Sequence, residues 1–291
     1  MWKDYLRLMR PHQYLKNLVI FLPAFFAQRI LEFDLLQDLV WGWLGFSLVA
    51  SSIYIFNDYQ DRVDDRLHPT KKARPLAAQT VRVSWALGLM AFLLIAGVAI
   101  VGMIQLSGLV VVGIYVLINV GYSLGLKHVP ILDLTQIAIG FLLRVGLGAV
   151  LAVPFIPLSG WIVMMIFLGA LFLGLAKRRD DLLLAQQGHK VRKSIDGYNL
   201  TFVNGAMILM GSVLIVAYVS YTLSPQTQAK FDTPYLYTTA FFVVLGILRY
   251  LQLVFVEEKG GDPTHLLLTD LSLQILINAW GLLCLWLIYF A

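Results

Sequence analysis

The 291-residue sequence contains a single cysteine, Cys284, and few charged residues. One cysteine cannot form an intramolecular disulfide, and it cannot supply the paired thiolates of a structural zinc site. Charged residues make up only 13% of the chain, whereas hydrophobic residues make up 59%. Soluble domains usually carry about 25% charged residues. The composition therefore excludes an ordinary soluble domain and indicates a polytopic membrane protein.

Nine apolar runs are long enough to cross a bilayer, for which a helix needs about 20 predominantly apolar residues. The fold class predicted is all-α, with one transmembrane domain over residues 1–291, because no linker separates the runs. The charged, amphipathic segment before the first run is unlike a cleavable signal and is expected to lie along the membrane interface. We expect the transmembrane helices over Leu15–Leu31, Leu39–Phe56, Val83–Met103, Leu106–Leu124, Leu132–Leu151, Trp161–Ala176, Leu200–Leu223, Tyr235–Val256 and Leu271–Phe290.

A weak internal repeat indicates two similar halves. The second run ends in Asn57 and Asp58 before a basic loop, and the sixth run ends in Lys177–Asp181 before another basic loop. The similarity lies in hydropathy and charge rather than in residue identity. It predicts two four-helix units with matching polar ends, within one domain.

The basic residues are distributed unevenly along the chain. If the N-terminus is cytoplasmic, 18 of the 22 Lys and Arg residues fall in inward-facing segments, and only Arg29 and Lys230 fall in outward-facing loops. The positive-inside rule then orients a multi-pass protein of the inner cell membrane. We expect cytoplasmic cap loops at about residues 57–82, 125–132 and 177–198.

Four carboxylates lie within Asn57–Asp65, directly behind the second apolar run. On a helix, Asp58, Asp61 and Asp65 share one face, and Asn57 lies one turn before Asp61. Oxygen ligands with no nearby cysteine suit Mg²⁺, which completes its shell with water and substrate phosphates. The pattern indicates a metal–diphosphate site at a membrane surface. The alternative is a solvated helix end, in which Arg62 pairs with Asp58.

Basic residues follow these carboxylates in a proline-bounded stretch. His68-Pro69 and Arg74-Pro75 break helical geometry on either side of Lys71 and Lys72. Acidic and basic side chains share a site when a phosphorylated ligand lies between them, since the metal and the cations each bind part of the phosphate charge. The alternative is a polybasic patch that contacts anionic lipid.

Two basic residues, Arg144 and Arg249, lie inside apolar runs. An arginine at the centre of a membrane helix costs about 2.5–3.5 kcal/mol on insertion scales unless it faces a cavity or a partner. Arg144 is therefore a functional candidate, and a helix–helix salt bridge is the alternative.

Taken together, these segments resemble the UbiA superfamily of intramembrane prenyltransferases over nearly the whole chain. Residues 57–65 match the superfamily's NDxxDxxxD metal motif, with Asn57, Asp58, Asp61 and Asp65 in the defining positions. Further segments resemble the decaprenyl-phosphate phosphoribosyltransferase branch, namely Arg10–Asn17, His68–Pro75, Tyr122–Lys127, Lys177–Arg179 and Asp262–Thr264. The resemblance implies a nine-helix bundle around a lipid-accessible cavity, Mg²⁺ as cofactor, and a place in cell-wall or envelope polysaccharide biosynthesis.

The chain departs from the superfamily after the sixth run. Members that use prenyl diphosphates carry a second aspartate-rich motif there, whereas this chain has Lys177, Arg178 and Arg179. Three cations in that place favour direct binding of phosphate. The resemblance then implies a phosphoribosyl diphosphate donor and a polyprenyl phosphate acceptor. Asp180 and Asp181 follow immediately, so a shifted second metal site and a prenyl donor remain an alternative.

The expected reaction is Mg²⁺-dependent transfer of 5-phosphoribose to a membrane polyprenyl phosphate, with release of diphosphate. Asp58, Asp61 and Asp65 are the expected catalytic residues, and together with Asn57 they are the expected metal ligands. The expected partners are the two substrates and the lipid bilayer, with no nucleic acid, and assembly into an oligomer is left open. A prenyltransferase and a transporter of polyprenyl phosphate or phospholipid are the competing hypotheses. The expected substrate-binding residues are Lys16, Asn17, Lys71, Arg74, Tyr122, Lys127, Arg144, Lys177, Arg178, Arg179 and Tyr198.

Overall fold

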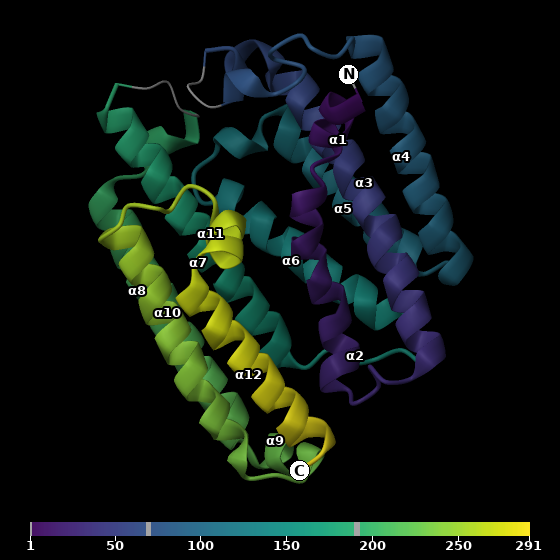
Figure 1. Ribbon diagram of the computed structural model, residues 1–291, viewed down its shortest axis with the longest axis vertical. Coiled ribbons are helices and arrows are strands. Elements are labelled where there is room, and N and C mark those ends of the chain that lie inside the picture. Colours follow the sequence, from purple (N-terminus) through teal and green to yellow (C-terminus); the bar gives the residue numbers. More distant parts are fainter. Residues whose placement is uncertain (1, 68–70, 189–192) are drawn as a thin grey trace. The chain divides into compact units, whose positions relative to one another are not determined.

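The computed structural model describes residues 2–67, 71–188 and 193–291, and these are predominantly helical with no β-strand among them (Figure 1). The all-α prediction is therefore confirmed. The chain divides into two compact units, one of residues 1–158 and 184–194 and the other of residues 159–183 and 195–291. The assignment of residues 1–291 to one domain remains a prediction.

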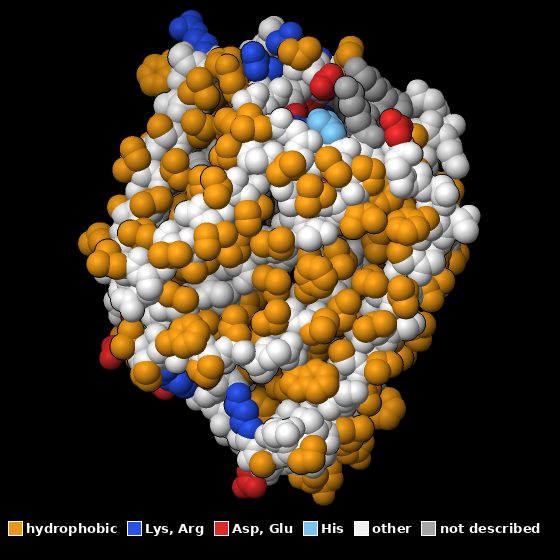
Figure 2. All heavy atoms as spheres, turned by 180° about the vertical axis from the view of Figure 1, so that it is seen from behind, with side chains coloured by type: hydrophobic (Ala, Val, Ile, Leu, Met, Phe, Trp, Pro, Cys, Tyr) orange, Lys and Arg blue, Asp and Glu red, His pale blue; other side chains and the backbone are white. Residues whose placement is uncertain are grey.

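Seven of the described helices are long and apolar enough to cross a membrane. Figure 2 shows one face of the molecule, on which hydrophobic side chains are spread over the whole surface and charged ones are few. The protein is a multi-pass membrane protein. The seven segments are α3 (Phe33–Asp65), α4 (Val83–Ile104), α6 (Leu132–Leu151), α7 (Gly160–Gln186), α8 (Leu200–Leu223), η5 with α10 (Tyr235–Thr239 and Ala240–Phe255), and α12 (Leu271–Tyr289).

The predicted count of nine spans is not confirmed. The fourth run forms α5 (Gly108–Leu124), which has 17 residues. The first run does not form one long α-helix, because it is divided between the 3-10 helix η1 (Pro11–Phe21) and the short α2 (Leu22–Phe26). Pro23 has no backbone N–H and cannot donate an α-helical hydrogen bond to the Val19 carbonyl. That carbonyl accepts instead from the Leu22 N–H, three residues along the chain, which is the 3-10 pattern.

Two of the expected cap loops also begin as helix. Residues 57–65 continue α3, and residues 177–186 continue α7, so both polar segments extend membrane helices rather than forming loops. Shorter elements complete the chain: α1 (Trp2–Met9), η2 (Lys71–Ala73), η3 (Leu126–His128), η4 (Lys193–Gly197), α9 (Pro225–Phe231) and α11 (Pro263–Thr269).

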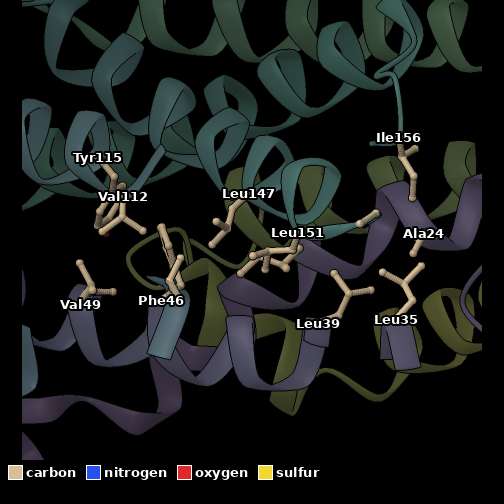
Figure 3. Packing of buried hydrophobic residues seen from close by; sticks show 14 of the residues in the cluster. Ala24, Leu35, Leu39, Phe46, Val49, Val112, Tyr115, Leu147, Leu151 and Ile156 are labelled. Atoms are coloured by element: carbon tan, nitrogen blue, oxygen red, sulfur yellow. The ribbon is translucent and has the colours of Figure 1, made fainter. Parts of the chain in front are cut away.

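The first unit is built around α3, which packs along α4 and contacts α5, α6 and η1. Phe46 of α3 lies against Tyr115 of α5, with ring centroids 4.6 Å apart, and both side chains belong to the buried cluster in Figure 3. Gly45 and Gly97 let α3 and α4 approach closely, because a Cβ on Gly97 would lie 2.4 Å from the Gly45 carbonyl oxygen. Small residues commonly permit such approach between membrane helices. This packing holds the middle of α3, whose last turns carry the acidic motif.

The helix η1 lies directly against α6 at Gly148. A Cβ on Gly148 would lie 1.8 Å from the Ile20 carbonyl oxygen, which is a backbone atom that cannot turn aside. The absence of a side chain at this position therefore sets how closely η1 approaches the core of the first unit.

Gly148→Ala is expected to destabilise the protein by about 1–3 kcal/mol, because the added methyl group must push η1 away from α6. The measurement is the thermal midpoint of the detergent-purified protein, followed by tryptophan fluorescence. Gly146→Ala is the matched control on the same helix, since its Cβ would meet no atom within 4 Å. Equal midpoints for the two variants would refute the close approach.

The second unit contains α8, α10 and α12, with α10 packed against both of the others. Arg249 of α10 donates to the Asp270 carboxylate at 2.6 Å and to Glu257 at 3.0 Å. Asp270 in turn accepts from the Leu273 N–H and so caps the first turn of α12. The hydrogen bond from Arg249 lowers the pKa of Asp270, which keeps this cap negatively charged.

Candidate active site

The acidic motif forms the last two and a half turns of α3, so the predicted helical face is present. Asp58 and Asp65 are 2% and 4% exposed, and Asp61 is half-buried. Burial on this scale argues against the solvated helix end. Arg62 does not make the alternative pair with Asp58, because it donates to the Tyr59 carbonyl at 2.6 Å and lies over the Tyr59 ring.

Each motif carboxylate contacts a basic side chain. We call Asp58, Asp61 and Asp65 the motif carboxylates. Arg74 donates through one nitrogen to Asp58 at 3.0 Å and to Asp65 at 2.8 Å, which links the first and last of them. Lys127, which lies in η3 beyond the end of α5, forms an ion pair with Asp61. These acidic and basic side chains therefore lie in contact, as predicted.

A third cation comes from a residue that was not among the predicted site residues. Arg10 donates to the same Asp58 oxygen at 2.5 Å, from 48 residues away in the sequence. It occupies the left-handed region of backbone space, with φ 52° and ψ 59°, at the junction between α1 and η1. A non-glycine residue in this region is uncommon, and such strain is concentrated at functional sites. We call Arg10, Arg74 and Lys127 the clamp cations.

The motif amide connects this site to α5. Asn57 donates to the second oxygen of Asp61 at 3.2 Å and accepts from the Ser123 hydroxyl at 3.2 Å. Ser123 is a site residue that the sequence did not reveal, because a serine near a helix end carries no specific signal. The amide oxygen therefore faces a neutral donor, whereas the carboxylates face cations.

The donor atoms at this site suit a hard divalent cation. Three carboxylates and one amide oxygen are the ligand types that Mg²⁺ prefers, and all four come from adjacent turns of one helix. Within the described part of the chain, no three acidic or histidine side chains converge on a common point as they lie. The carboxylates point to the clamp cations instead, so metal binding requires these side chains to turn.

Two of the predicted substrate-binding residues lie deeper in the first unit. Asn17 donates to Ser47 at 2.8 Å and accepts from Arg144 at 2.7 Å. Ser47 and Asp58 are eleven residues apart on α3, which places them about 16 Å apart along the helix axis. Neither Asn17 nor Arg144 therefore reaches the motif carboxylates.

Arg144 has a defined place in the packing of the first unit. Besides the bond to Asn17, it donates to the Gly140 carbonyl at 2.6 Å and to the Tyr115 hydroxyl at 3.3 Å. Its guanidinium also lies 5.2 Å from the ring centroids of Phe46, Tyr115 and Phe141. The predicted alternative for Arg144 was a salt bridge, and these contacts are instead with neutral groups of η1, α3, α5 and α6. Such contacts offset the desolvation of a cation at membrane depth.

The basic triplet of α7, in the second unit, does not form a cluster. Successive residues on a helix point about 100° apart. Lys177 is exposed. Arg178 is fully buried and pairs with Asp181 at 2.9 Å. Arg179 is buried and donates to the Asn204 side chain and to the Val254 carbonyl.

The remaining predicted residues are placed as follows. Lys16, Lys71 and Tyr122 are half-buried in η1, η2 and α5 of the first unit. Tyr198 is buried in the second unit, with its ring 6.0 Å from that of Phe202. His68–Thr70, part of the segment that resembles the phosphoribosyltransferase branch, lies outside the described residues, and so do Lys190 and Arg192 in the third cap loop.

Comparison with known proteins decides the family of this chain. The profile of the UbiA prenyltransferase family matches residues 17–290. The chain belongs to the UbiA prenyltransferase family. Membership makes the protein a membrane-embedded transferase and favours an enzyme over a transporter.

Among sequence relatives of this UbiA family member are two curated decaprenyl-phosphate phosphoribosyltransferases. The protein of Mycolicibacterium smegmatis is 32% identical over 289 residues, which cover 94% of this chain and 89% of the relative. The protein of Corynebacterium glutamicum is 32% identical over 281 residues, which cover 94% of this chain and 83% of the relative.

The fold is shared with a solved UbiA homologue from Archaeoglobus fulgidus, bound to DMAPP and Mg²⁺. The TM-score is 0.69 over 98% of this chain and 96% of that one, at 18% sequence identity. The similarity establishes that this chain has the UbiA fold.

Proposed function

We propose that the protein transfers 5-phosphoribose from phosphoribosyl diphosphate to a membrane polyprenyl phosphate of the decaprenyl type. The observation that carries this proposal is the relation, over almost the full chain, to two decaprenyl-phosphate phosphoribosyltransferases. The site supports it, because buried carboxylates alternate with cations at the end of a membrane helix. A metal–diphosphate group fits between side chains of both signs.

The reaction exchanges one bond at the anomeric carbon of the ribose. The bond from this carbon to the diphosphate oxygen breaks, and a phosphate oxygen of the lipid acceptor forms the new bond. Positive charge develops on the sugar, as in the oxocarbenium-like transition states of glycoside hydrolysis. The acceptor is already an anion, so no strong general base is required, and the chain contributes mainly positioning and charge stabilisation.

Each part of the site has a role in this reaction. The motif carboxylates and Asn57 would hold Mg²⁺, which stabilises the negative charge of the departing diphosphate. The clamp cations would donate to the phosphate oxygens of the same group. Lys71, half-buried in η2 of the same unit, is a further candidate for a phosphate contact. The exposed Lys177, in the second unit, stays a separate prediction as a phosphate-binding residue.

The prenyl-diphosphate alternative depends on a second metal site at Asp180 and Asp181. Asp181 pairs at 2.9 Å with Arg178, whose side chain is fully buried. The clamp cations are partly exposed and can turn to a phosphate, whereas Arg178 has no exposed part that could release Asp181, which weakens this alternative.

The deciding experiment supplies purified protein with phosphoribosyl diphosphate labelled with ³²P in the 5-phosphate, together with polyprenyl phosphate. Label is expected in the lipid phase, dependent on both the acceptor and Mg²⁺, and absent with Asp61→Asn. A donor labelled in its diphosphate should instead release the label to the water phase. The two results together identify phosphoribose as the group that is transferred. Transfer from a prenyl diphosphate but not from this donor would overturn the proposal.

We further propose that the protein lies in the inner membrane, with its N-terminus and the polar segments of the site on the cytoplasmic side. The charged donor is made in the cytoplasm. Single cysteines at the exposed positions Gln79, His128 and Gln187, in a Cys284→Ser background, are expected to react with an impermeant thiol reagent only after permeabilisation. A cysteine at the exposed Gln226, in α9, should react in intact cells. Labelling of any of the first three in intact cells would refute this orientation.

A further inference from the structure

Arg10 joins two helices through an uncommon backbone conformation. Its N–H donates to the Leu6 carbonyl at 3.2 Å and closes α1, and its carbonyl accepts from the Gln13 N–H at 2.9 Å at the start of η1. Between these bonds its backbone is left-handed, with φ 52°. A non-glycine residue keeps this conformation only when the surrounding structure holds it there. The contacts around Arg10 should therefore include groups that fix its backbone.

Ser51 of α3 makes such a contact. Its hydroxyl donates at 2.7 Å to the carbonyl of Met9, the residue immediately before Arg10. Met9 is the last residue of α1, and the last carbonyls of an α-helix have no partner within the helix. A hydroxyl group has one hydrogen, which Ser51 gives to Met9, so the Tyr14 hydroxyl at 2.9 Å must donate to Ser51. Ser51 thus binds residues on both sides of Arg10.

The same face of α3 also contacts the side chain of Arg10. Tyr54 and Asp58 follow Ser51 by three and seven residues, so all three point to one side of the helix. The Arg10 guanidinium lies 5.2 Å from the centroid of the Tyr54 ring and donates to Asp58 at 2.5 Å. One face of α3 therefore holds Arg10 both at its backbone and along its side chain.

We infer that Ser51 is a positioning residue for phosphoribosyl transfer, which fixes the Met9–Arg10 peptide and thereby directs the guanidinium of Arg10. Ser51 is fully buried, so it acts through Arg10 rather than on a substrate. Tyr14 supports it by orienting its hydroxyl. The inference rests on the proposed function for the contact of Arg10 with phosphate, whereas the placement of the Arg10 side chain can be tested without any substrate.

The neighbouring Ser52 provides a matched control. It is 2% exposed, and its hydroxyl donates at 2.7 Å to the Val49 carbonyl, three residues earlier on α3. Serine side chains in helices commonly bond to their own backbone in this way. Ser52→Ala therefore removes a hydroxyl from an equally buried position, but the bond that is lost joins two residues of the same helix.

The first measurement is the rate at which phenylglyoxal, a reagent for arginine side chains, modifies Arg10 in the purified protein without substrate. Mass spectrometry of the peptides compares Arg10 with the exposed Arg82 as internal reference. Ser51→Ala is expected to raise the relative rate about threefold or more, because a guanidinium held less firmly against Asp58 is more accessible. Ser52→Ala should leave the relative rate unchanged. The thermal midpoint of each variant confirms that it is folded.

The second measurement is a double-mutant cycle on kcat/KM for the phosphoribosyl donor. Arg10→Gln is expected to lower kcat/KM about a hundredfold, and Ser51→Ala alone about tenfold. In the Arg10→Gln background, Ser51→Ala should change kcat/KM by less than about twofold, because a residue that acts through Arg10 then has no guanidinium to direct. A serine that only stabilises the fold would lower kcat/KM by the same factor in both backgrounds.

Tyr14→Phe tests the same contact from its other side. It removes only the hydroxyl that donates to Ser51, so it should shift both measurements in the direction of Ser51→Ala by a smaller factor. Its result decides the inference if Ser51→Ala does not fold.

The outcomes separate this inference from the proposed function. Equal rates of Arg10 modification in the wild type and in folded Ser51→Ala would overturn the positioning and leave the proposed function intact. Additive effects in the double-mutant cycle would also overturn it. If the wild-type protein transfers no phosphoribose, the proposed function fails, whereas faster modification of Arg10 in Ser51→Ala would still support the placement of Arg10 by Ser51.

Discussion

Asp61→Asn is expected to lower the rate of phosphoribosyl transfer by about a thousandfold or more, while the protein still folds. The substitution keeps the shape of the side chain and removes the negative charge that would hold the metal. Loss of a single group that stabilises transition-state charge commonly costs about 10²–10³ in rate, and loss of the ion removes several such interactions. Because Asp61 is half-buried near the end of α3, little packing is lost.

The measurement is the initial rate at saturating donor across a range of Mg²⁺ concentrations, together with the thermal midpoint. Asp64→Asn is the matched control, since Asp64 lies on the same turns of α3 but is exposed and outside the motif positions. Turnover like that of the wild type in Asp61→Asn, at ordinary Mg²⁺, would remove the metal assignment.

Arg178→Met is expected to destabilise the protein by about 3–5 kcal/mol, because it leaves the buried Asp181 without its 2.9 Å ion-pair partner. The result should be a lower thermal midpoint and a lower yield of folded protein, with little change in the Michaelis constants of the molecules that fold. Arg178→Met combined with Asp181→Leu should recover most of the stability, since no uncompensated charge remains.

The neighbouring Lys177→Ala provides the contrast. Lys177 is exposed, so this variant should keep the wild-type midpoint and raise the Michaelis constant of the donor or of the lipid phosphate if Lys177 contacts phosphate. A stable Arg178→Met protein with a raised Michaelis constant would reverse these roles and make Arg178 the phosphate ligand.

The sequence predicted the acidic face of the site well, because helical spacing alone determines which motif residues share a face. It also predicted that bases would lie beside these acids, and Arg74 and Lys127 do so. Arg10 could not be assigned in this way. Its contact with Asp58 depends on how α1 and η1 pack against α3, which is a tertiary feature that no local pattern encodes.

The two largest departures have simple physical causes. Hydropathy reports that Leu15–Leu31 is apolar, but it does not distinguish an α-helix from a 3-10 helix followed by a short α-helix, so the single long helix expected there is divided in two. The basic triplet was treated as one cluster because its members are adjacent in sequence. On α7, adjacent residues point in different directions, and only Lys177 faces outward.

The length of α3 determines the depth at which chemistry can occur. Its 33 residues extend for about 50 Å, whereas the hydrocarbon layer is only about 30 Å thick. The single helix α3 can thus cross the hydrocarbon core completely and still place its last turns among the lipid headgroups. A water-soluble sugar phosphate could then meet the phosphate end of a polyprenyl chain at the depth where that phosphate already resides. The acceptor would not have to be lifted out of the membrane, and the donor would not have to enter it.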